Sequence, residues 1–222
     1  LSQHPDTLVG PREGYAFDIS GTCVGVLEGT APIFGSRIEP GDVVIGMASN
    51  GIHANGLTLA RSVLLGEDLE TASRSLPECG KTIGQELLRT THIYVPEVLA
   101  LLASGVDVRG LAHISGDGLL NLLRLDVEVD YYLDALLPVP PVFGVIQRDG
   151  RVDVREMYRV FNMGIGFCVV VPADQADLAL RAIRQEGGSA SVIGSAIQGN
   201  RKGLLPEVGL VGSGHSFQLM DS

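Results

Sequence analysis

The sequence predicts an α/β protein in which helices pack on a sheet. Residues 43–47 form an apolar run, which passes through a turn rich in glycine into a segment with helical spacing over residues 57–65. Residues 106–123 repeat this order of apolar strand, glycine turn and short helix. Two such units place both turns at the same edge of a sheet, which is the usual position for a ligand site in α/β proteins.

Composition limits the classes of protein that the chain can represent. Its 222 residues are 45% hydrophobic and 19% charged, so the chain can bury a substantial core. The net charge of −10, with 16 scattered Lys and Arg residues, argues against nucleic acid and anionic membranes as partners. The sequence has no apolar run of about 18 residues and no secretory leader, so we expect a cytoplasmic protein without a membrane span.

The three cysteines, Cys23, Cys79 and Cys168, are far apart and odd in number. Cys23 and Cys168 lie within apolar, strand-like runs, which favours buried free thiols over disulfides. The histidines also lack the spacing of metal ligands, so we predict no metal site.

The remaining elements follow from periodicity and from glycine and proline positions. Residues 1–14 are irregular, 15–28 resemble a strand bent at Gly21, and 31–40 form a connector that ends in a turn, near a domain boundary. Residues 66–80 are expected to form an exposed loop. The further predicted helices are 81–88, 96–103, 142–146, 153–160 and 173–186, the further strands are 127–133, 167–171 and 190–197, and the tail is expected to contain turns and at most one strand.

The turn after the first strand is the strongest candidate site. Free backbone N–H groups and the positive end of the helix dipole would converge there, which suits a phosphate. We expect His53 and Asn55 at its lip, with Asn55 capping the helix. The alternative is a plain tight turn that needs its glycines for backbone geometry and carries a surface histidine. The candidate residues of this turn are Ser49, Asn50, Gly51, His53, Asn55 and Gly56.

Two further glycine turns carry polar residues. In the second turn, His113, Ser115, Gly116 and Asp117 are candidates, although His113 is expected to be a hydrogen-bonded structural residue and not a catalyst. Asp117 is expected to form the turn, with water-mediated Mg²⁺ binding as the alternative. The third turn covers residues 161–166 before an apolar strand, and Asn162 could reach a ligand from it.

Four stretches carry a resemblance to a known family. They are residues 17–25 (Phe-Asp-Ile-Ser-Gly-Thr-Cys-Val-Gly), the block 41–56, residues 112–119 (Ala-His-Ile-Ser-Gly-Asp-Gly-Leu) and residues 156–166 (Glu-Met-Tyr-Arg-Val-Phe-Asn-Met-Gly-Ile-Gly). In order and spacing they resemble the carboxy-terminal two thirds of the phosphoribosylformylglycinamidine cyclo-ligase (AIR synthetase) family, and Thr91-His-Ile-Tyr94 fits the family's threonine-arginine-isoleucine-tyrosine. Ile52, Ala54 and Asp117 depart from the usual family residues, which are proline, serine and glycine.

The resemblance implies a two-domain architecture. Residues 1–35 would be the tail of an amino-terminal domain that binds ATP and forms a homodimer. Residues 36–222 would be the carboxy-terminal domain, a mixed sheet with helices. ATP and Mg²⁺ are the implied cofactors, with most of their ligands in the amino-terminal domain, so this chain alone is expected to be inactive.

The implied activity is the ATP-dependent cyclisation of formylglycinamidine ribonucleotide to aminoimidazole ribonucleotide in purine biosynthesis. His53 is then the candidate catalytic residue, either polarising the formyl oxygen or moving a proton. The candidate substrate-binding residues are Ser49, Asn50, Gly51, Asn55, Gly56 and Asn162. Two alternatives are a non-catalytic module for binding a phosphoribosyl ligand or for assembly, and another ATP-using member of the same superfamily.

Overall fold

The computed structural model describes residues 21–27, 31–66 and 68–220, and the chain divides into two compact units, Leu1–Pro32 and Ile33–Ser222. In the first unit, residues 21–27 form no regular element, so the expected strand is absent from this part; residues 1–20 and 28–30 lie outside the described residues. Cys23 is exposed, and the prediction that it is buried was wrong. Cys168 is buried as predicted.

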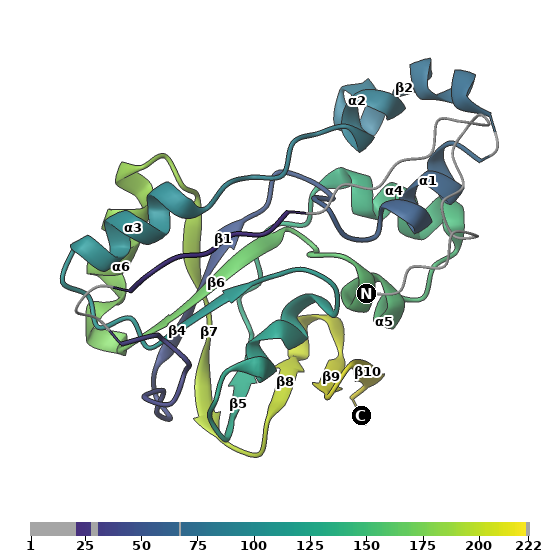
Figure 1. Cartoon of the computed structure of the whole chain (residues 1–222). Helices are drawn as coiled ribbons and strands as arrows, with labels where there is room; N and C mark the ends of the chain where they lie inside the picture. The colour runs from purple at the N-terminus through teal and green to yellow at the C-terminus, as the bar shows by residue number, and fades with distance from the viewer. Residues whose placement is uncertain (1–20, 28–30, 67, 221–222) are drawn as a thin grey trace. The chain divides into compact units, whose positions relative to one another are not determined.

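The second unit contains a curved sheet of eight strands in the order β10-β9-β8-β5-β7-β1-β6-β4 (Figure 1). All neighbours are antiparallel except β5 and β8. The strands are β1 (Val43–Ala48), β4 (Gly110–His113), β5 (Val129–Tyr132), β6 (Ile165–Val171), β7 (Ala190–Gln198), β8 (Lys202–Leu205), β9 (Leu210–Ser213) and β10 (Ser216–Leu219). The tail therefore adds three strands, where the sequence predicted at most one.

Six α-helices lie in the described residues, and none of them is long and apolar enough to cross a lipid bilayer. They are α1 (Leu57–Leu64), α2 (Ile83–Leu87), α3 (Val95–Ala103), α4 (Pro141–Gly150), α5 (Val154–Val160) and α6 (Ala176–Gln185). The expected loop 66–80 contains the short helical turns Leu69–Ser73 and Pro77–Cys79 and the strand β2 (Ser75–Leu76), which pairs with β3 (Lys81–Thr82). The short helix expected at the end of residues 106–123 is a 3₁₀-helix over Gly118–Arg124.

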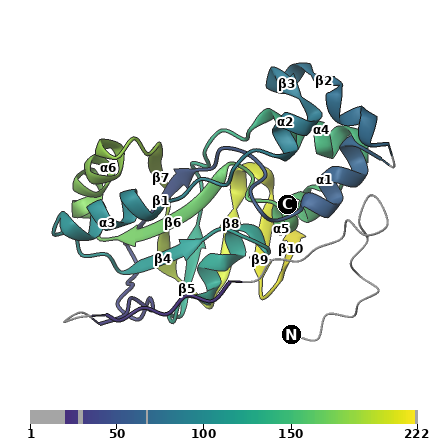
Figure 2. The ribbon, with the colours of Figure 1, turned by 45° about the horizontal axis from the view of Figure 1, so that its top comes forward.

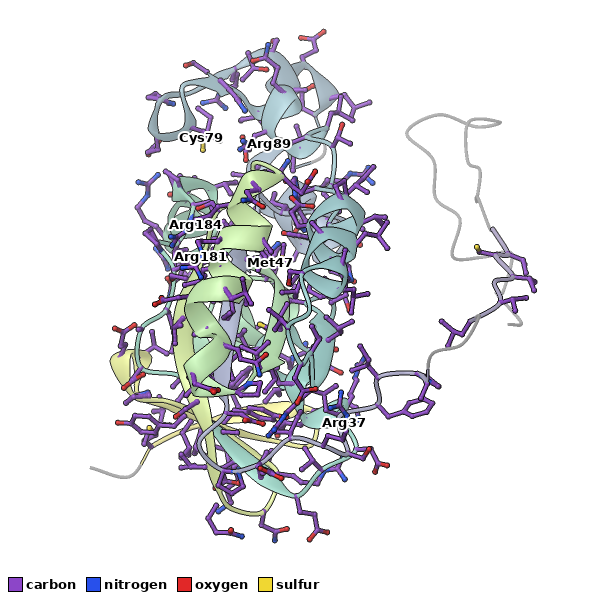
Figure 3. The ribbon with its side chains drawn as sticks, turned by 90° about the vertical axis from the view of Figure 1, so that its left-hand side faces the viewer. Arg37, Met47, Cys79, Arg89, Arg181 and Arg184 are labelled. Atoms are coloured by element: carbon purple, nitrogen blue, oxygen red, sulfur yellow. The ribbon has the colours of Figure 1, made fainter. Side chains whose placement is uncertain are left out.

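Both faces of the central strands are buried, which explains why their sequences are apolar throughout. On one face, Ile45 and Met47 of β1 pack with Ile183 of α6 and Leu101 of α3. Figures 1 and 2 show α3 and α6 side by side on this face. Arg184 of α6, labelled in Figure 3, donates a hydrogen bond of 3.0 Å to the carbonyl oxygen at the start of β7. The other face contributes to a second core beneath α1, α4 and α5.

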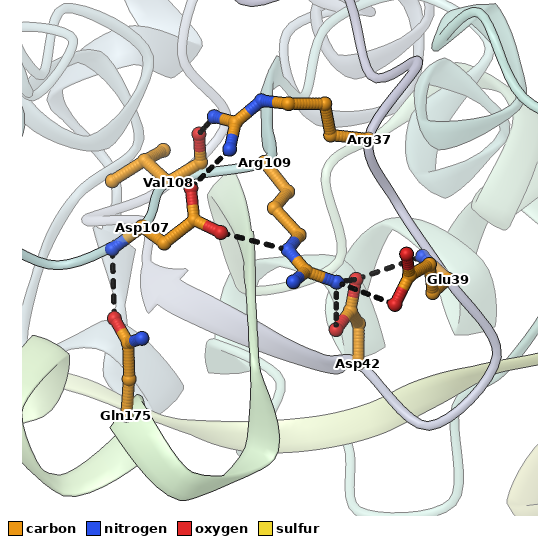
Figure 4. A network of polar contacts seen from close by, with 7 residues as sticks. All are labelled: Arg37, Glu39, Asp42, Asp107, Val108, Arg109 and Gln175. Atoms are coloured by element: carbon orange, nitrogen blue, oxygen red, sulfur yellow. Dashed lines mark hydrogen bonds and ion pairs between the residues drawn. The ribbon is translucent and has the colours of Figure 1, made fainter.

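A network of hydrogen bonds and ion pairs between charged residues links the starts of β1 and β4 (Figure 4). Arg109 donates hydrogen bonds to Asp107 and Asp42 at 3.0 Å each and contacts Glu39 at 3.3 Å. Asp107 also pairs with Arg37. The hydrogen bond to Asp107, with those to Asp42 and Glu39, raises the pKa of Arg109 above its usual range. This network stabilises the end of the sheet from which β1 and β4 start.

Candidate functional site

The strand register brings the three glycine turns to one edge of the sheet. Met47 of β1 and His113 of β4 both pair with Phe167 of β6, and β6 is antiparallel to each of them. Strands β1 and β4 are therefore parallel to one another and end where β6 begins. The turns after β1 and β4 and the turn before β6 meet at this edge, which confirms the predicted convergence of the first two turns.

Asn162, in the third turn, holds the first turn in place. Its side chain is 3% exposed. The amide Nδ2 donates to the carbonyl oxygens of Gly51 at 2.8 Å and Ile52 at 3.1 Å. The Oδ1 atom accepts from the Ser49 hydroxyl at 2.7 Å and from the Gly164 N–H at 2.9 Å. Both polar ends of the amide are thus used to join two turns.

His53 is buried, with 7% of its surface exposed, so it is not the surface histidine of the plain-turn alternative. Its backbone has a φ of 63°, in the left-handed region that few non-glycine residues adopt. Ring atom Nε2 lies 2.9 Å from Asn50 Oδ1, and Nδ1 has no hydrogen-bond partner in the described part of the chain. Burial lowers the pKa of His53 to about 4, with smaller electrostatic contributions from His113, His92 and Arg89, so the ring is neutral at pH 7.

Gly56, and not Asn55, precedes the first residue of α1, and no side chain caps this helix. The capping role predicted for Asn55 was therefore wrong. Gly56 has a φ of 80°, and a Cβ atom there would lie 2.3 Å from the ring of Phe161. Asn55 instead lies next to the second turn, since its Oδ1 is 3.6 Å from the position of a Cβ on Gly116. The first and second turns are therefore direct neighbours.

The second turn differs from its prediction in one respect. His113 has an exposed side chain near Tyr94 and Phe167, with ring centroids 6.4 and 6.1 Å away. Its imidazole makes no hydrogen bond within the described residues. Its expected hydrogen-bonded role was wrong. Ser115 and Gly116 are half-buried in the same turn.

Asp117, with a φ of 71°, has its carboxylate paired with Arg124 and His215 at 2.8 Å each. Burial acts to raise the pKa of Asp117, but the hydrogen bonds from His215 and Arg124 outweigh it and lower the pKa. Within residues 21–27, 31–66 and 68–220, no three His, Cys, Asp or Glu side chains are grouped as metal ligands.

Tyr94 lines two cavities beside these turns. Its hydroxyl donates to the Ala48 carbonyl oxygen at 2.9 Å, and burial raises its pKa, which keeps the hydroxyl protonated. One cavity, of about 380 Å³, is mainly apolar and is lined by His92, Tyr94, Val95, Val98, Leu99, His113 and Phe167. The other, of about 220 Å³, includes Ser49, Asn50, His92, Tyr94, Glu97 and Gly188 in its lining.

Sequence reasoning missed Arg89 and Glu86 as neighbours of the first turn. A Cβ on Gly51 would lie 3.1 Å from Glu86 Oε1 and 3.3 Å from Arg89 Cδ. Glu86 is 3% exposed and lies 3.8 Å from both Arg89 Nη1 and Lys81 Nζ. Arg89 follows α2 and is labelled in Figure 3. No local pattern indicated this contact, because it depends on how α2 packs against a distant turn.

Comparisons with known proteins identify the family of the chain. The model of the family described as AIR synthase related protein, C-terminal domain, matches residues 39–205. The phosphoribosylformylglycinamidine cyclo-ligase of Methanopyrus kandleri is 43% identical over 199 residues, which cover 90% of this chain and 56% of the relative. The protein of the same name from Methanothermobacter thermautotrophicus is 48% identical over 163 residues, covering 73% of this chain and 48% of the relative. The chain thus spans about half the length of these curated relatives.

A solved structure supports the fold. The structure of E. coli HypE, a hydrogenase maturation protein, aligns with a TM-score of 0.51 and 18% sequence identity, covering 84% of this chain and 51% of that chain. At this identity the likeness concerns architecture alone.

Proposed function

Because the chain belongs to the AIR synthase related family, we propose that it forms the carboxy-terminal part of a phosphoribosylformylglycinamidine cyclo-ligase. The observation that carries this proposal is the meeting of three glycine turns around the buried, neutral His53. The full enzyme would use ATP and Mg²⁺ to activate the formyl oxygen of formylglycinamidine ribonucleotide. Ring closure to aminoimidazole ribonucleotide would follow as phosphate leaves, in the purine pathway.

The first turn would bind the ribonucleotide. Its glycines and the first turn of α1 supply backbone N–H groups and the positive end of a helix dipole, which favour a phosphate. Arg89 would add positive charge beside Gly51. His53 is neutral at pH 7, so it would contact the reacting part of the substrate through hydrogen bonding and not supply charge. Ser49, Asn50, Asn55 and Gly56 would complete this surface.

The second and third turns would form the remaining sides of the binding site. Gly116 lies against Asn55, and His113 and Ser115 are at the same sheet edge. Asn162 would act on the substrate through the turn that it holds. Most ATP and Mg²⁺ ligands, and the surface for a homodimer in the cytoplasm, would come from the amino-terminal domain, with residues 1–35 as its tail.

The direct test is a cyclisation assay with ATP and Mg²⁺, using this chain supplied with the amino-terminal half found in its curated relatives. Formation of the aminoimidazole product is expected, and His53→Ala should remove most of it. The surface variant Asn200→Ala is the control, because Asn200 is exposed and distant in sequence from all three turns. Ligand binding without turnover would favour the binding-module alternative, and turnover of a different substrate would favour another ATP-using activity. Unchanged turnover in His53→Ala would refute the catalytic role.

A further inference from the structure

We propose that Asn50 is a positioning residue that holds the His53 ring as the Nε2–H tautomer and leaves Nδ1 as a hydrogen-bond acceptor. A neutral imidazole carries its proton on only one of its two nitrogens, so the identity of that nitrogen decides what the ring offers a ligand. The tautomer itself follows from geometry. Only its consequence for the substrate rests on the proposed function.

The orientation of the Asn50 amide is fixed by a backbone carbonyl. Asn50 Nδ2 donates to the Thr90 carbonyl oxygen at 3.0 Å. A carbonyl oxygen only accepts, so the NH₂ end of the amide must face Thr90. The other end, Oδ1, therefore faces His53 Nε2 at 2.9 Å.

An amide oxygen also only accepts, so the ring nitrogen facing it must carry the proton. The Nε2–H tautomer makes this hydrogen bond. The opposite tautomer would place two lone pairs 2.9 Å apart and would leave a buried Nδ1–H donor without an acceptor. Its one gain is a long contact of 3.4 Å from the Asn50 backbone N–H to Nε2, which is too weak to compensate.

The fixed tautomer distinguishes the two roles open to His53. With Nε2–H occupied by Asn50, the remaining polar atom is the Nδ1 lone pair, which is buried and has no partner among the described residues. A substrate that reaches Nδ1 would therefore donate an N–H or O–H hydrogen bond to His53, and the ring would not donate one to the formyl oxygen. Burial opposes a second proton on the ring, and the neighbouring Arg89 guanidinium adds to this effect.

Nitrogen-15 NMR of the imidazole rings tests the assignment on the 222-residue chain at pH 7. His53 is identified by the signal that disappears in His53→Gln. We expect Nε2 to be protonated with a preference of about tenfold or more, because the other tautomer buries an unpaired donor. In Asn50→Ala the preference should fall or reverse, since the backbone N–H of residue 50 then has Nε2 as its acceptor.

Asn50→Asp is the matched variant, because it keeps an oxygen facing Nε2. It should retain the Nε2–H tautomer and raise the His53 pKa through its negative charge. Asn200→Ala should leave the His53 signals unchanged. A protonated Nδ1 in the unmodified chain, or an unaltered preference in Asn50→Ala, would overturn the proposal. If Asn50→Ala does not fold, the unmodified chain and Asn50→Asp decide the question. None of these spectra depends on turnover, so the tautomer and the proposed enzyme activity can fail independently.

Discussion

Replacement of Asn162 should remove the side-chain hydrogen bonds that join the first turn to the third. Asn162→Ala removes four hydrogen bonds, those to the Gly51 and Ile52 carbonyls and those from the Ser49 hydroxyl and the Gly164 N–H. Gly51, Ile52 and Gly164 are buried, so these groups have little access to solvent. The substitution therefore leaves several buried polar groups without partners.

The magnitude follows from the number of groups left unpaired. Each buried unsatisfied group costs about 1–3 kcal/mol. Water entering the space vacated by the amide can restore part of the hydrogen bonding, because that space is polar. We therefore expect Asn162→Ala to lower the free energy of unfolding by about 3–5 kcal/mol, less than the simple sum over four groups.

Asn162→Asp tests the two ends of the amide individually, because it replaces only the NH₂ group and hardly changes the side-chain volume. The carboxylate keeps both bonds to Oδ1, but it places an oxygen against the carbonyls of Gly51 and Ile52. Burial and these carbonyls should raise the Asp pKa above its unfolded value near 3.9. Its destabilisation should then be greatest above the folded pKa and should diminish as the pH falls through that value.

Urea unfolding at pH 7.5 and pH 5 measures these effects, provided that the slope of free energy against urea is unchanged. Asn200→Ala is the control for loss of a surface asparagine. If Asn162→Ala stays within about 1 kcal/mol of this control, Asn162 does not hold the turn and the argument is refuted.

Three further predictions concern the neighbours of this turn. The pKa of His53 is lowered in the folded chain, so the unfolded chain binds more protons below pH 6.5, and the free energy of unfolding should fall by about 2 kcal/mol from pH 7 to pH 5. Urea unfolding of His53→Asn should lack this loss. An equal dependence of the unfolding free energy on pH in both proteins would contradict the prediction. Gly166→Ala places a Cβ 2.0 Å from Tyr94 Oη and should lower the free energy of unfolding by about 2 kcal/mol or more. The control, Gly144→Ala in α4, meets no atom within 4 Å and should leave the midpoint of thermal unfolding unchanged or raise it. Equal midpoints for the two variants would exclude the clash. Tyr94→Phe leaves the Ala48 carbonyl unpaired and should cost about 1 kcal/mol in urea unfolding, and no loss would show that this hydrogen bond is replaced.

The predictions that succeeded rest on local pattern. Strand β1 and helix α1 were predicted because an apolar run and a helical repeat follow one another, and β7 because its residues suit a strand. The convergence of two turns followed from repeating the same unit. The four stretches of the resemblance led to the family that the comparisons establish. None of these steps required knowledge of distant contacts.

The predictions that failed depend on tertiary contacts. His53 lies in a glycine- and asparagine-rich turn, which gave no sign of burial, yet packing of this turn against Tyr94 and Gly166 buries it. The tail strands lack a strong apolar pattern, and β8 is defined by pairing with β5 and β9. The cap was assigned to Asn55 by residue preference, but Asn55 faces Gly116 and leaves Gly56 at the helix start.

Strand β6 is the element on which the site depends most. It lies between β1 and β4, so the turn before it is adjacent to both turns that follow those strands. Asn162 bonds to the first turn, the Gly164 carbonyl oxygen accepts from the Ser49 N–H at 2.9 Å, and Gly166 lies against the rings of His53 and Tyr94. A change at the start of β6 should therefore move the first turn even when the core is unchanged. The segment containing residues 161–166 supports the candidate catalytic surface, and the buried hydrogen bonds of Asn162 lie in this segment.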